Sequence, residues 1–229
     1  MCCGYKAGFE TTSTNEGRGA RTRLSLGWVT GPPLPTALQS FLDALPAGLD
    51  SYPQAVAKAS ILRTFLAKTD ATKGWAGDLP APLPALVEAP PPDSAWVPEA
   101  HCHGVYLAAR DLLFPTDTSY IAHWRAVNES IVTGKLYRAI FALISPARVL
   151  TGTGSRWGRL HDGIELLVEA ESNSAELIMK YPRELVPELL AQSYTTAFDG
   201  VLRASGGRRV EVVLSEYTSR TASYRGTFG

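Results

Sequence analysis

The hydrophobic pattern of the chain changes from a helical period to a period of two near Gly163. Before this residue, apolar side chains recur three and four positions apart, which predicts amphipathic helices. After it, four segments alternate apolar and polar residues, and a long segment between them keeps the helical spacing. In chain order these segments are 164–170, 175–180, 183–204, 209–215 and 221–228. The order strand–strand–helix–strand–strand predicts an α+β fold, with an N-terminal helical layer packed on an antiparallel sheet.

The first half of the chain predicts a series of shorter elements, bounded by capping residues and prolines. Residues 22–30 alternate well enough for a short strand. The predicted helices are 36–45, one from Ser51 through Leu66, one opened by Pro98, one that begins at Asp117 or Thr118, and 135–144. Ser145-Pro146 then starts a short helical turn that leads into the hairpin.

A proline-rich segment separates the early helices from the later ones. Seven prolines lie from Pro80 to Pro98, so we expect neither a helix nor a β-ladder to run through residues 70–98. The segment is either a linker or a strap packed on the surface, because it also carries large apolar residues. We therefore divide the chain into a flexible tail (1–20), an N-terminal region with a short strand, helices and the strap (21–95), and an α+β ligand-binding-like domain (96–229).

Charge and composition narrow the classes of partner. The 22 Lys and Arg residues balance the 22 Asp and Glu residues, which argues against a general nucleic-acid binder, since such proteins need a basic excess. No apolar run approaches the roughly 18 to 20 residues of a membrane-spanning helix, so no membrane insertion is expected. Cys2, Cys3 and Cys102 make no disulfide framework, and the N-terminus has no signal-peptide pattern. We expect a cytoplasmic protein.

The densest group of reactive residues is His101-Cys102-His103. The side chains of residues i and i+2 in a helix point in directions about 200° apart, so His101 and His103 would not coordinate one metal ion there. In an extended segment they would share a face. No second pair of ligands has the spacing of a zinc site, and no metal is predicted. Cys102 would act as a nucleophile only with a histidine and an Asn or Asp from elsewhere, such as His161-Asp162.

Other motifs have ordinary structural interpretations. Residues 151–156 are rich in glycine but lack the Lys-Ser/Thr end of a P-loop, so we interpret them as a connection between a helix and the hairpin. The basic and aromatic residues at 156–161 and 208–225 suit solvated sheet edges better than a nucleic-acid surface. The acidic positions of the hairpin, such as Glu165 and Glu176, predict the solvent side of the sheet.

A set of landmarks over the last 130 or so residues gives a family resemblance. The landmarks are, in order, Trp124, Ser145-Pro146, Trp157, His161-Asp162-Gly163, Tyr181-Pro182, Gly206-Gly207 and Tyr224. Their order resembles uncharacterised developmental-type protein families that are abundant in myxobacteria. Those families are distantly similar to the haem-NO-binding, 4-vinyl-reductase and TRAPP-subunit ligand-binding domains.

The resemblance implies helices over a curved antiparallel sheet, with an internal pocket suited to a haem, a small aromatic molecule or an acyl chain. A haem-NO-binding domain also needs a proximal histidine on a helix and a Tyr-x-Ser-x-Arg motif. In the nearest string, Tyr217 to Thr221, a threonine stands where the arginine should be, and no cysteine cluster lies near the hairpins. We therefore predict no cofactor. The candidate ligand-binding residues are Trp124, Tyr137, Trp157, His161, Tyr194 and Tyr224.

These observations predict a non-enzymatic binding or sensory module for a small apolar ligand or a partner protein. The first alternative is a structural or regulatory interaction subunit, with a homodimer as one form. The second is an enzyme of unknown chemistry that uses the His101, Cys102 and His103 region. No catalytic residue is assigned.

Overall fold

The computed structural model describes residues 36–69, 74–133 and 157–229. All described residues belong to one compact unit, Pro32–Gly229. The predictions for the tail, for the strand at 22–30, for the helix at 135–144, for the glycine-rich segment 151–156 and for Tyr137 lie outside the described residues.

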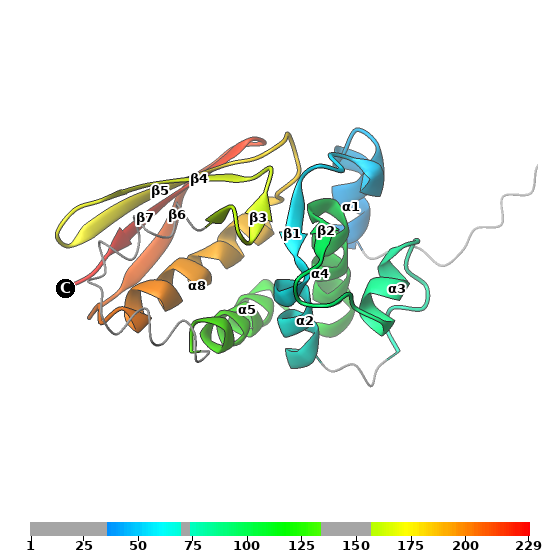
Figure 1. Cartoon of the computed structure of the whole chain (residues 1–229), viewed down its shortest axis with the longest axis horizontal. Coiled ribbons are helices and arrows are strands. Elements are labelled where there is room, and N and C mark those ends of the chain that lie inside the picture. The colour runs from blue at the N-terminus through cyan, green and yellow to red at the C-terminus, as the bar shows by residue number, and fades with distance from the viewer. Residues whose placement is uncertain (1–35, 70–73, 134–156) are drawn as a thin grey trace, which may run out of the picture. The chain divides into compact units, whose positions relative to one another are not determined.

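The helical part of the unit is built from α1 (Thr36–Ala44), α2 (Ala59–Lys68), α4 (Glu99–Leu113) and α5 (Asp117–Val132), with a 3-10 turn at Gly48–Asp50 (Figure 1). Helix α4 begins directly after Pro98, as predicted, and ends at Leu113, with Phe114 as its C-cap. The N-cap of α5 is Thr116, one residue before the predicted cap, because its side chain accepts from the Ser119 amide in a capping box. None of the described helices combines the length and the apolar character needed to cross a membrane.

The predicted helix from Ser51 to Leu66 is wrong in its first half. Val56–Lys58 is a strand, β1, and helix α2 begins only at Ala59. Tyr52 has a φ of 53°, which breaks any helix there. The β-branched Val56 instead pairs with Pro98 on one side and with Asp162 on the other. Pairing partners far away in the sequence thus override the local helical spacing.

The proline-rich segment also contains regular structure, contrary to the prediction. Helix α3 (Leu83–Glu88) carries Pro84 in its first turn, where the missing N–H has no helical partner to lose. Strand β2 (Trp96–Pro98) lies at the edge of a sheet, where a proline is tolerated. Leu83 is fully buried, so this part of the segment is packed on the core.

A small antiparallel sheet of order β2-β1-β3 joins early and late parts of the chain. Its third strand, β3, is only His161–Asp162 and pairs with Ala57 and Val56 of β1. Strands of two or three residues have no readable alternation, so the pattern of the sequence did not predict this sheet.

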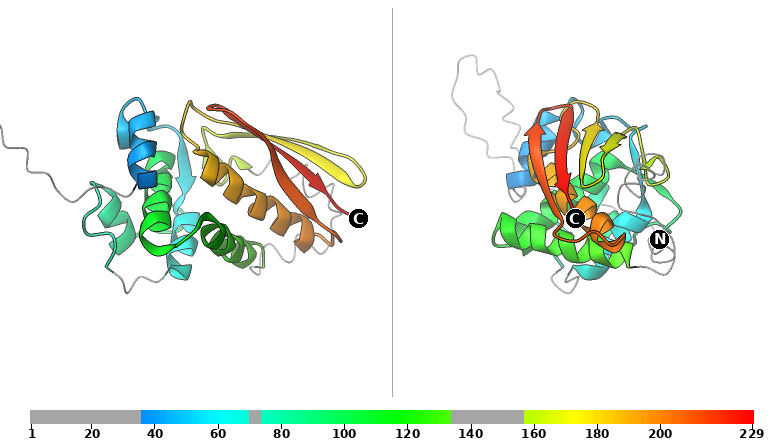
Figure 2. Two further views of the ribbon diagram at one scale, coloured as in Figure 1. Left: turned by 180° about the vertical axis from the view of Figure 1, so that it is seen from behind. Right: turned by 90° about the vertical axis from the view of Figure 1, so that its left-hand side faces the viewer.

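The larger sheet confirms the predicted α+β fold with its antiparallel strands. Strands β4 (Glu165–Ala170), β5 (Ser174–Lys180), β7 (Thr221–Thr227) and β6 (Glu211–Tyr217) lie in that spatial order. Helix α8 (Glu188–Ala204) packs on one face of this sheet, and α5 packs against α8 (Figure 2). The helix begins at residue 188, five residues later than predicted, because the chain at Glu184 has a φ of 61°.

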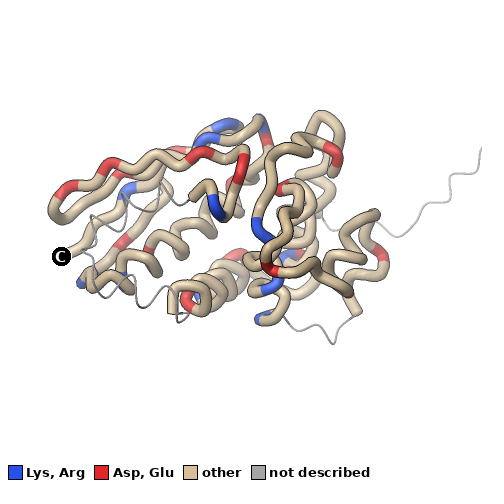
Figure 3. The backbone as a smooth tube through the Cα atoms, viewed as in Figure 1, with Lys and Arg blue, Asp and Glu red and all other residues tan. Residues whose placement is uncertain are grey.

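The core between α8 and the sheet is tightly filled. Phe198 of α8 is 1% exposed and faces the sheet, with its ring centroid 5.0 Å from that of Tyr224. The Tyr224 hydroxyl donates to the Ala191 carbonyl of α8 at 3.0 Å. Glu165 and Glu176 are exposed, as predicted. Figure 3 shows acidic residues spaced along the strands of this sheet.

Candidate functional site

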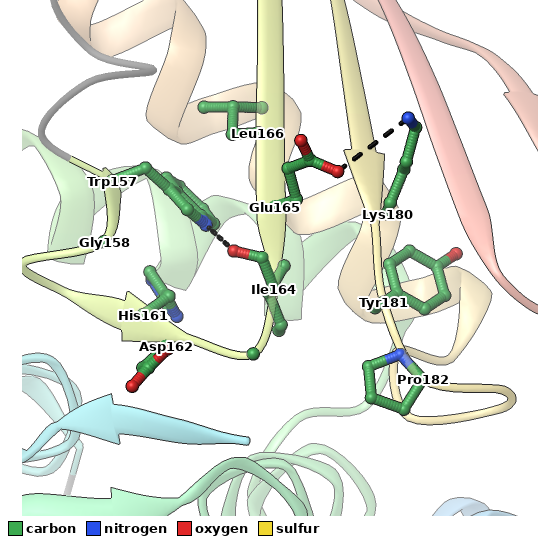
Figure 4. Close-up of a pocket in the computed structure, with 11 residues that line it drawn as sticks. Trp157, Gly158, His161, Asp162, Ile164, Glu165, Leu166, Lys180, Tyr181 and Pro182 are labelled. Carbon is green, nitrogen blue, oxygen red and sulfur yellow. Dashed lines mark hydrogen bonds and ion pairs between the residues drawn. The ribbon is translucent and has the colours of Figure 1, made fainter. Parts of the chain in front are cut away.

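A pocket of about 720 Å³ opens beside the start of β4 (Figure 4). Its lining comes from the turn before β3, from β3 itself, from β4, and from the end of β5. The lining residues are Trp157, Gly158, His161, Asp162, Gly163, Ile164, Glu165, Leu166, Lys180, Tyr181 and Pro182. Segments about 15 to 25 residues apart in the sequence therefore meet at one hollow, whose volume lies within the range of small-molecule sites.

Trp157 forms one wall of the pocket. Its indole N–H donates to the Ile164 carbonyl at 2.8 Å, which ties the turn at 157–160 to the start of β4 (Figure 4). The backbone of the turn is closed by the Leu160 amide, which donates to the Trp157 carbonyl. The side chain is thus fixed at its polar end as well as by packing.

His161 lies against Trp157 with the two rings nearly parallel, at 17° and 4.2 Å between centroids. Its Nδ1 lies 2.5 Å from the Glu99 carboxylate, at the first turn of α4. Both side chains are nearly inaccessible, at 6% exposed for His161 and 1% for Glu99. A buried carboxylate thus orients the one histidine that lines the pocket.

The same carboxylate also faces His103, one turn further along α4. The distance from His103 Nε2 to the second Glu99 oxygen is 3.3 Å, and His103 Nδ1 donates to the Leu185 carbonyl at 2.8 Å. Burial alone would raise the pKa of Glu99, but the charge and the hydrogen bond of His161, with the charge of His103, hold that pKa below its ordinary value. Glu99 is therefore an ionised carboxylate buried between two histidines.

Gly163 allows the sharp passage from β3 to β4 at the pocket. Its φ is +82°, which glycine adopts without strain, and a Cβ added there would lie 2.8 Å from the Ala55 Cα. The close approach of the two backbones leaves no room for a side chain. Glycine at this position therefore permits His161 to reach Glu99 while the chain turns into the sheet.

The rim of the pocket is charged, whereas its floor is apolar. Ile164 and Leu166 are buried on the floor, and Asp162 is exposed on the rim. Lys180 lies 3.8 Å from Glu165 across the β4–β5 pair, in a solvated ion pair (Figure 4). Asp162 has no ion-pair or hydrogen-bond partner among the residues that the structure describes. The rim therefore carries one net negative charge.

The structure brings three of the six predicted ligand-binding residues together. Tyr194 of α8 lies beside Trp157 and His161, with ring centroids 5.9 and 6.2 Å away. Trp157 and His161 line the pocket itself. Tyr224 is in the core behind Phe198 and does not line the pocket. Its assignment as a ligand residue therefore has no support in the described geometry.

Trp124 belongs to a different aromatic cluster, between α2, α4 and α5. It is 6% exposed and packs against Phe65 and Tyr106, with centroids 4.9 and 4.8 Å away. It does not line the described pocket. Its burial explains the strong helical spacing of apolar residues around it, and its role here is in the core.

The sequence analysis missed Glu99, which holds the site together. A glutamate that follows Pro98 reads as a favourable charge at a helix N-terminus. The available signal was its spacing: Glu99 and His103 are four residues apart on a predicted helix and therefore share a face. Lys180 and Asp162 were also missed as pocket residues, because only the fold brings their strands together.

The region proposed for an enzymatic alternative does not reach the pocket. Cys102 is fully buried, and burial raises the pKa of its thiol well above the ordinary value, so the nucleophilic thiolate is disfavoured. His101 lies on α4 near the Leu49 backbone. Within the described segments, no group of three or more His, Cys, Asp or Glu side chains is arranged to hold a metal ion.

Comparison with known proteins gives a likeness of fold. No family model matches the sequence, and a search of curated proteins finds no match. Among solved structures, an unliganded Fe(II) mutant H-NOX protein from K. algicida is 13% identical with a TM-score of 0.52, over 75% of this chain and 96% of that one. A structure that probes haem distortion in the H-NOX family is 11% identical with a TM-score of 0.50, over 75% and 94%. The chain thus has an H-NOX-like α+β fold.

The residues at the pocket do not fit a haem. A haem iron is held by an axial side chain, most simply a histidine. All four histidines are described, and only His161 lines the pocket. A macrocycle bound to His161 Nε2 would extend on both sides of the imidazole plane. The Trp157 indole covers one face of the imidazole, with 4.2 Å between the ring centroids. The indole therefore occupies space that half of the macrocycle would need. The string from Tyr217 to Thr221 forms the turn between β6 and β7 and does not line the pocket.

Proposed function

We propose that this protein is a non-enzymatic sensory module that binds a small molecule in the pocket beside Trp157 and His161. The observation that carries the proposal is that buried side chains, each fixed by its own hydrogen bond, line an open pocket. Trp157 is held by Ile164, and His161 is held by Glu99. Side chains that are already ordered lose little entropy when a ligand binds, so such a wall favours binding. The H-NOX-like fold supports the same proposal.

The family landmarks give independent support for this location. Trp157, the run from His161 to Gly163, and Tyr181-Pro182 carry the resemblance noted in the sequence, and all of them line the pocket. The finer features, that the ligand is small and apolar and that the chain is related to the myxobacterial families, remain part of this proposal.

The connections of His161 offer a route by which binding would be sensed. His161 pairs with Ala57 of β1 and contacts Glu99 of α4, which in turn faces His103. A ligand that moves His161 would therefore also shift the first turn of α4 and the small sheet. The ligand drives such a change only if it binds the arrangement with His161 moved more tightly than the arrangement described here.

A ligand screen with a blocking variant tests the proposal. Gly158 lines the pocket, and a Cβ added there meets nothing within 4 Å, so Gly158→Leu should narrow the pocket from a position that has room for a side chain to start. Gly77 has the same freedom outside the pocket, and Gly77→Leu is the matched control. Native mass spectrometry of protein from its own source identifies bound molecules, and thermal shifts rank them. A ligand at 100 times its Kd should stabilise the parent and the control by about 2.7 kcal/mol.

The blocking variant is expected to lose this stabilisation. In the parent, the ligand should also shift the NMR signals of the Ile164 methyl groups and of the Trp157 indole N–H. Equal stabilisation of Gly158→Leu and Gly77→Leu would place the ligand elsewhere. A protein that neither carries nor binds any small molecule in the screen would contradict the proposal as a whole.

A second candidate function is regulatory protein interaction, and the open face of the larger sheet favours it. Leu167 and Val213 lie on this face and are 39% and 45% exposed, which is high for large apolar side chains. Light scattering after size exclusion separates the two functions. A dimer that Leu167→Glu converts to a monomer, with ligand binding absent, would favour the interaction role.

A further inference from the structure

The hydrogen bond between His161 and Glu99 fixes which ring nitrogen is left for a ligand. An ionised carboxylate only accepts hydrogen bonds, so Nδ1 of His161 carries the N–H that faces it. In the neutral ring, Nε2 is then an unprotonated acceptor. Nε2 has no partner among the described residues, and His161 lines the pocket. The pocket wall therefore presents a ring-nitrogen acceptor with no donor among the described residues.

The charges on the rim agree with a ligand that brings the donor. Asp162, the neighbour of His161 on β3, is exposed and without a described partner. Lys180 is opposed by Glu165 at 3.8 Å, so the rim keeps one negative charge. A cation next to Asp162 would be attracted, whereas an anion would face an unpaired carboxylate and an imidazole lone pair.

We propose that the pocket binds a small cation with an apolar body, whose N–H group donates to His161 Nε2 and whose positive charge lies beside Asp162. A protonated amine attached to a flat ring has this chemistry. The apolar body would lie over the floor formed by Ile164 and Leu166. This inference rests on the proposed function, because it names the class of ligand for the same pocket. It replaces the apolar ligand named there with a cation that has an apolar body.

Three probes with one shared ring test the class of ligand. Tryptamine is a cation, 3-methylindole is neutral, and indole-3-acetate is an anion. At pH 8, tryptamine should bind at least about tenfold more tightly than indole-3-acetate, as an ionic contact predicts. 3-Methylindole, which lacks the positive charge, should bind more weakly than tryptamine.

Two variants test which residues of the pocket recognise the cation. Asp162→Asn should weaken tryptamine binding by about tenfold, since this rim residue is exposed and its replacement is the same size. Glu176→Gln neutralises an exposed carboxylate of β5 outside the pocket and is the matched control. His161→Gln removes Nε2 from the pocket wall, so tryptamine binding should weaken.

The results of these binding experiments distinguish a wrong ligand class from a wrong proposed function. Equal or tighter binding of indole-3-acetate, or unchanged tryptamine binding by Asp162→Asn, overturns the proposed ligand class. If none of the three probes binds while the earlier screen finds a ligand in the pocket, the class is wrong and the proposed function stands. If His161→Gln fails to fold, the comparison of the three probes and the Asp162→Asn result still decide.

Discussion

At the scale of single residues, Glu99 has the largest expected effect on stability. It is 1% exposed and contacts two histidines, so Glu99→Gln removes charge-assisted bonds without changing the size of the side chain. We expect the variant to lose about 1.5 to 3 kcal/mol of unfolding free energy at pH 7. Urea unfolding measures this change. Glu176→Gln, at an exposed position, should stay within about 0.5 kcal/mol of the parent.

The pH dependence of the same pair of proteins checks the direction of the Glu99 pKa shift. The pKa of this carboxyl is lower in the folded protein than its ordinary value of 4.5. Its contribution is therefore fully present above about pH 4.5 and is lost as the pH falls through the folded pKa. The stability gap between the parent and Glu99→Gln should narrow on acidification below pH 4.5. A gap that widens there would mean that Glu99 is protonated in the folded protein.

The residues of the site differ in how far the sequence reveals them. Trp157 and His161 were predicted from the landmarks of the family resemblance, and both line the pocket. Glu99 was missed because its partner His161 is 62 residues away and the pairing depends on β3. Trp124 is another of these landmarks, but an aromatic side chain by itself does not distinguish a buried core residue from a ligand-binding one.

At the scale of elements, the junction of β3 and β4 depends on Gly163. A side chain there would meet the Ala55 backbone and would be held at a φ of +82°. Gly163→Ala should cost about 1 to 3 kcal/mol of stability, as other strained positive-φ residues do. Gly158→Ala, five residues earlier and with open space around its Cβ, is the control and should change stability by less than about 1 kcal/mol. Thermal unfolding of both variants compares them.

Helix α5 offers a second test at this scale. Trp124 is packed against Phe65, Tyr106 and Tyr120 inside the helical layer. Trp124→Ala should destabilise the protein by about 3 to 5 kcal/mol, as a large truncation in a core does. Chemical denaturation measures this loss of unfolding free energy. A loss below about 1 kcal/mol would show that the cluster around Trp124 is loosely packed and would return this residue to the binding candidates.

The elements that the sequence predicted well are those with long, regular patterns. The hairpin of β4 and β5, helix α8 and the last two strands were all located from their alternation or their apolar stripe. The errors fall where long-range contacts decide the structure. Val56 has helical spacing but pairs with two distant strands, and residues 183–187 continue the stripe of α8 but form a turn in which Leu185 and Val186 are buried.

At the scale of the whole molecule, the described helices and the larger sheet share one hydrophobic core. Buried apolar side chains form a single cluster that runs from Leu38 of α1 to Phe228 at the end of β7. Strand β1 strengthens this link, because it pairs with β2 on one side and with β3, just before the sheet, on the other. The boundary at residue 95 remains a prediction of the sequence, and the cooperativity of unfolding tests it.

We expect the unit Pro32–Gly229 to unfold in one transition, because unfolding any part of a shared core removes packing contacts from the remaining part. Leu38 and Leu177 are both fully buried at opposite ends of that core. Leu38→Ala and Leu177→Ala should each cost about 2 to 5 kcal/mol and lower Tm by about 4 to 20 °C. In both variants, tryptophan fluorescence and amide exchange in β5 should report the same loss. If Leu38→Ala destabilises the helices while the exchange of β5 stays at the parent's rate, the two parts unfold separately and the boundary near residue 95 is a domain boundary.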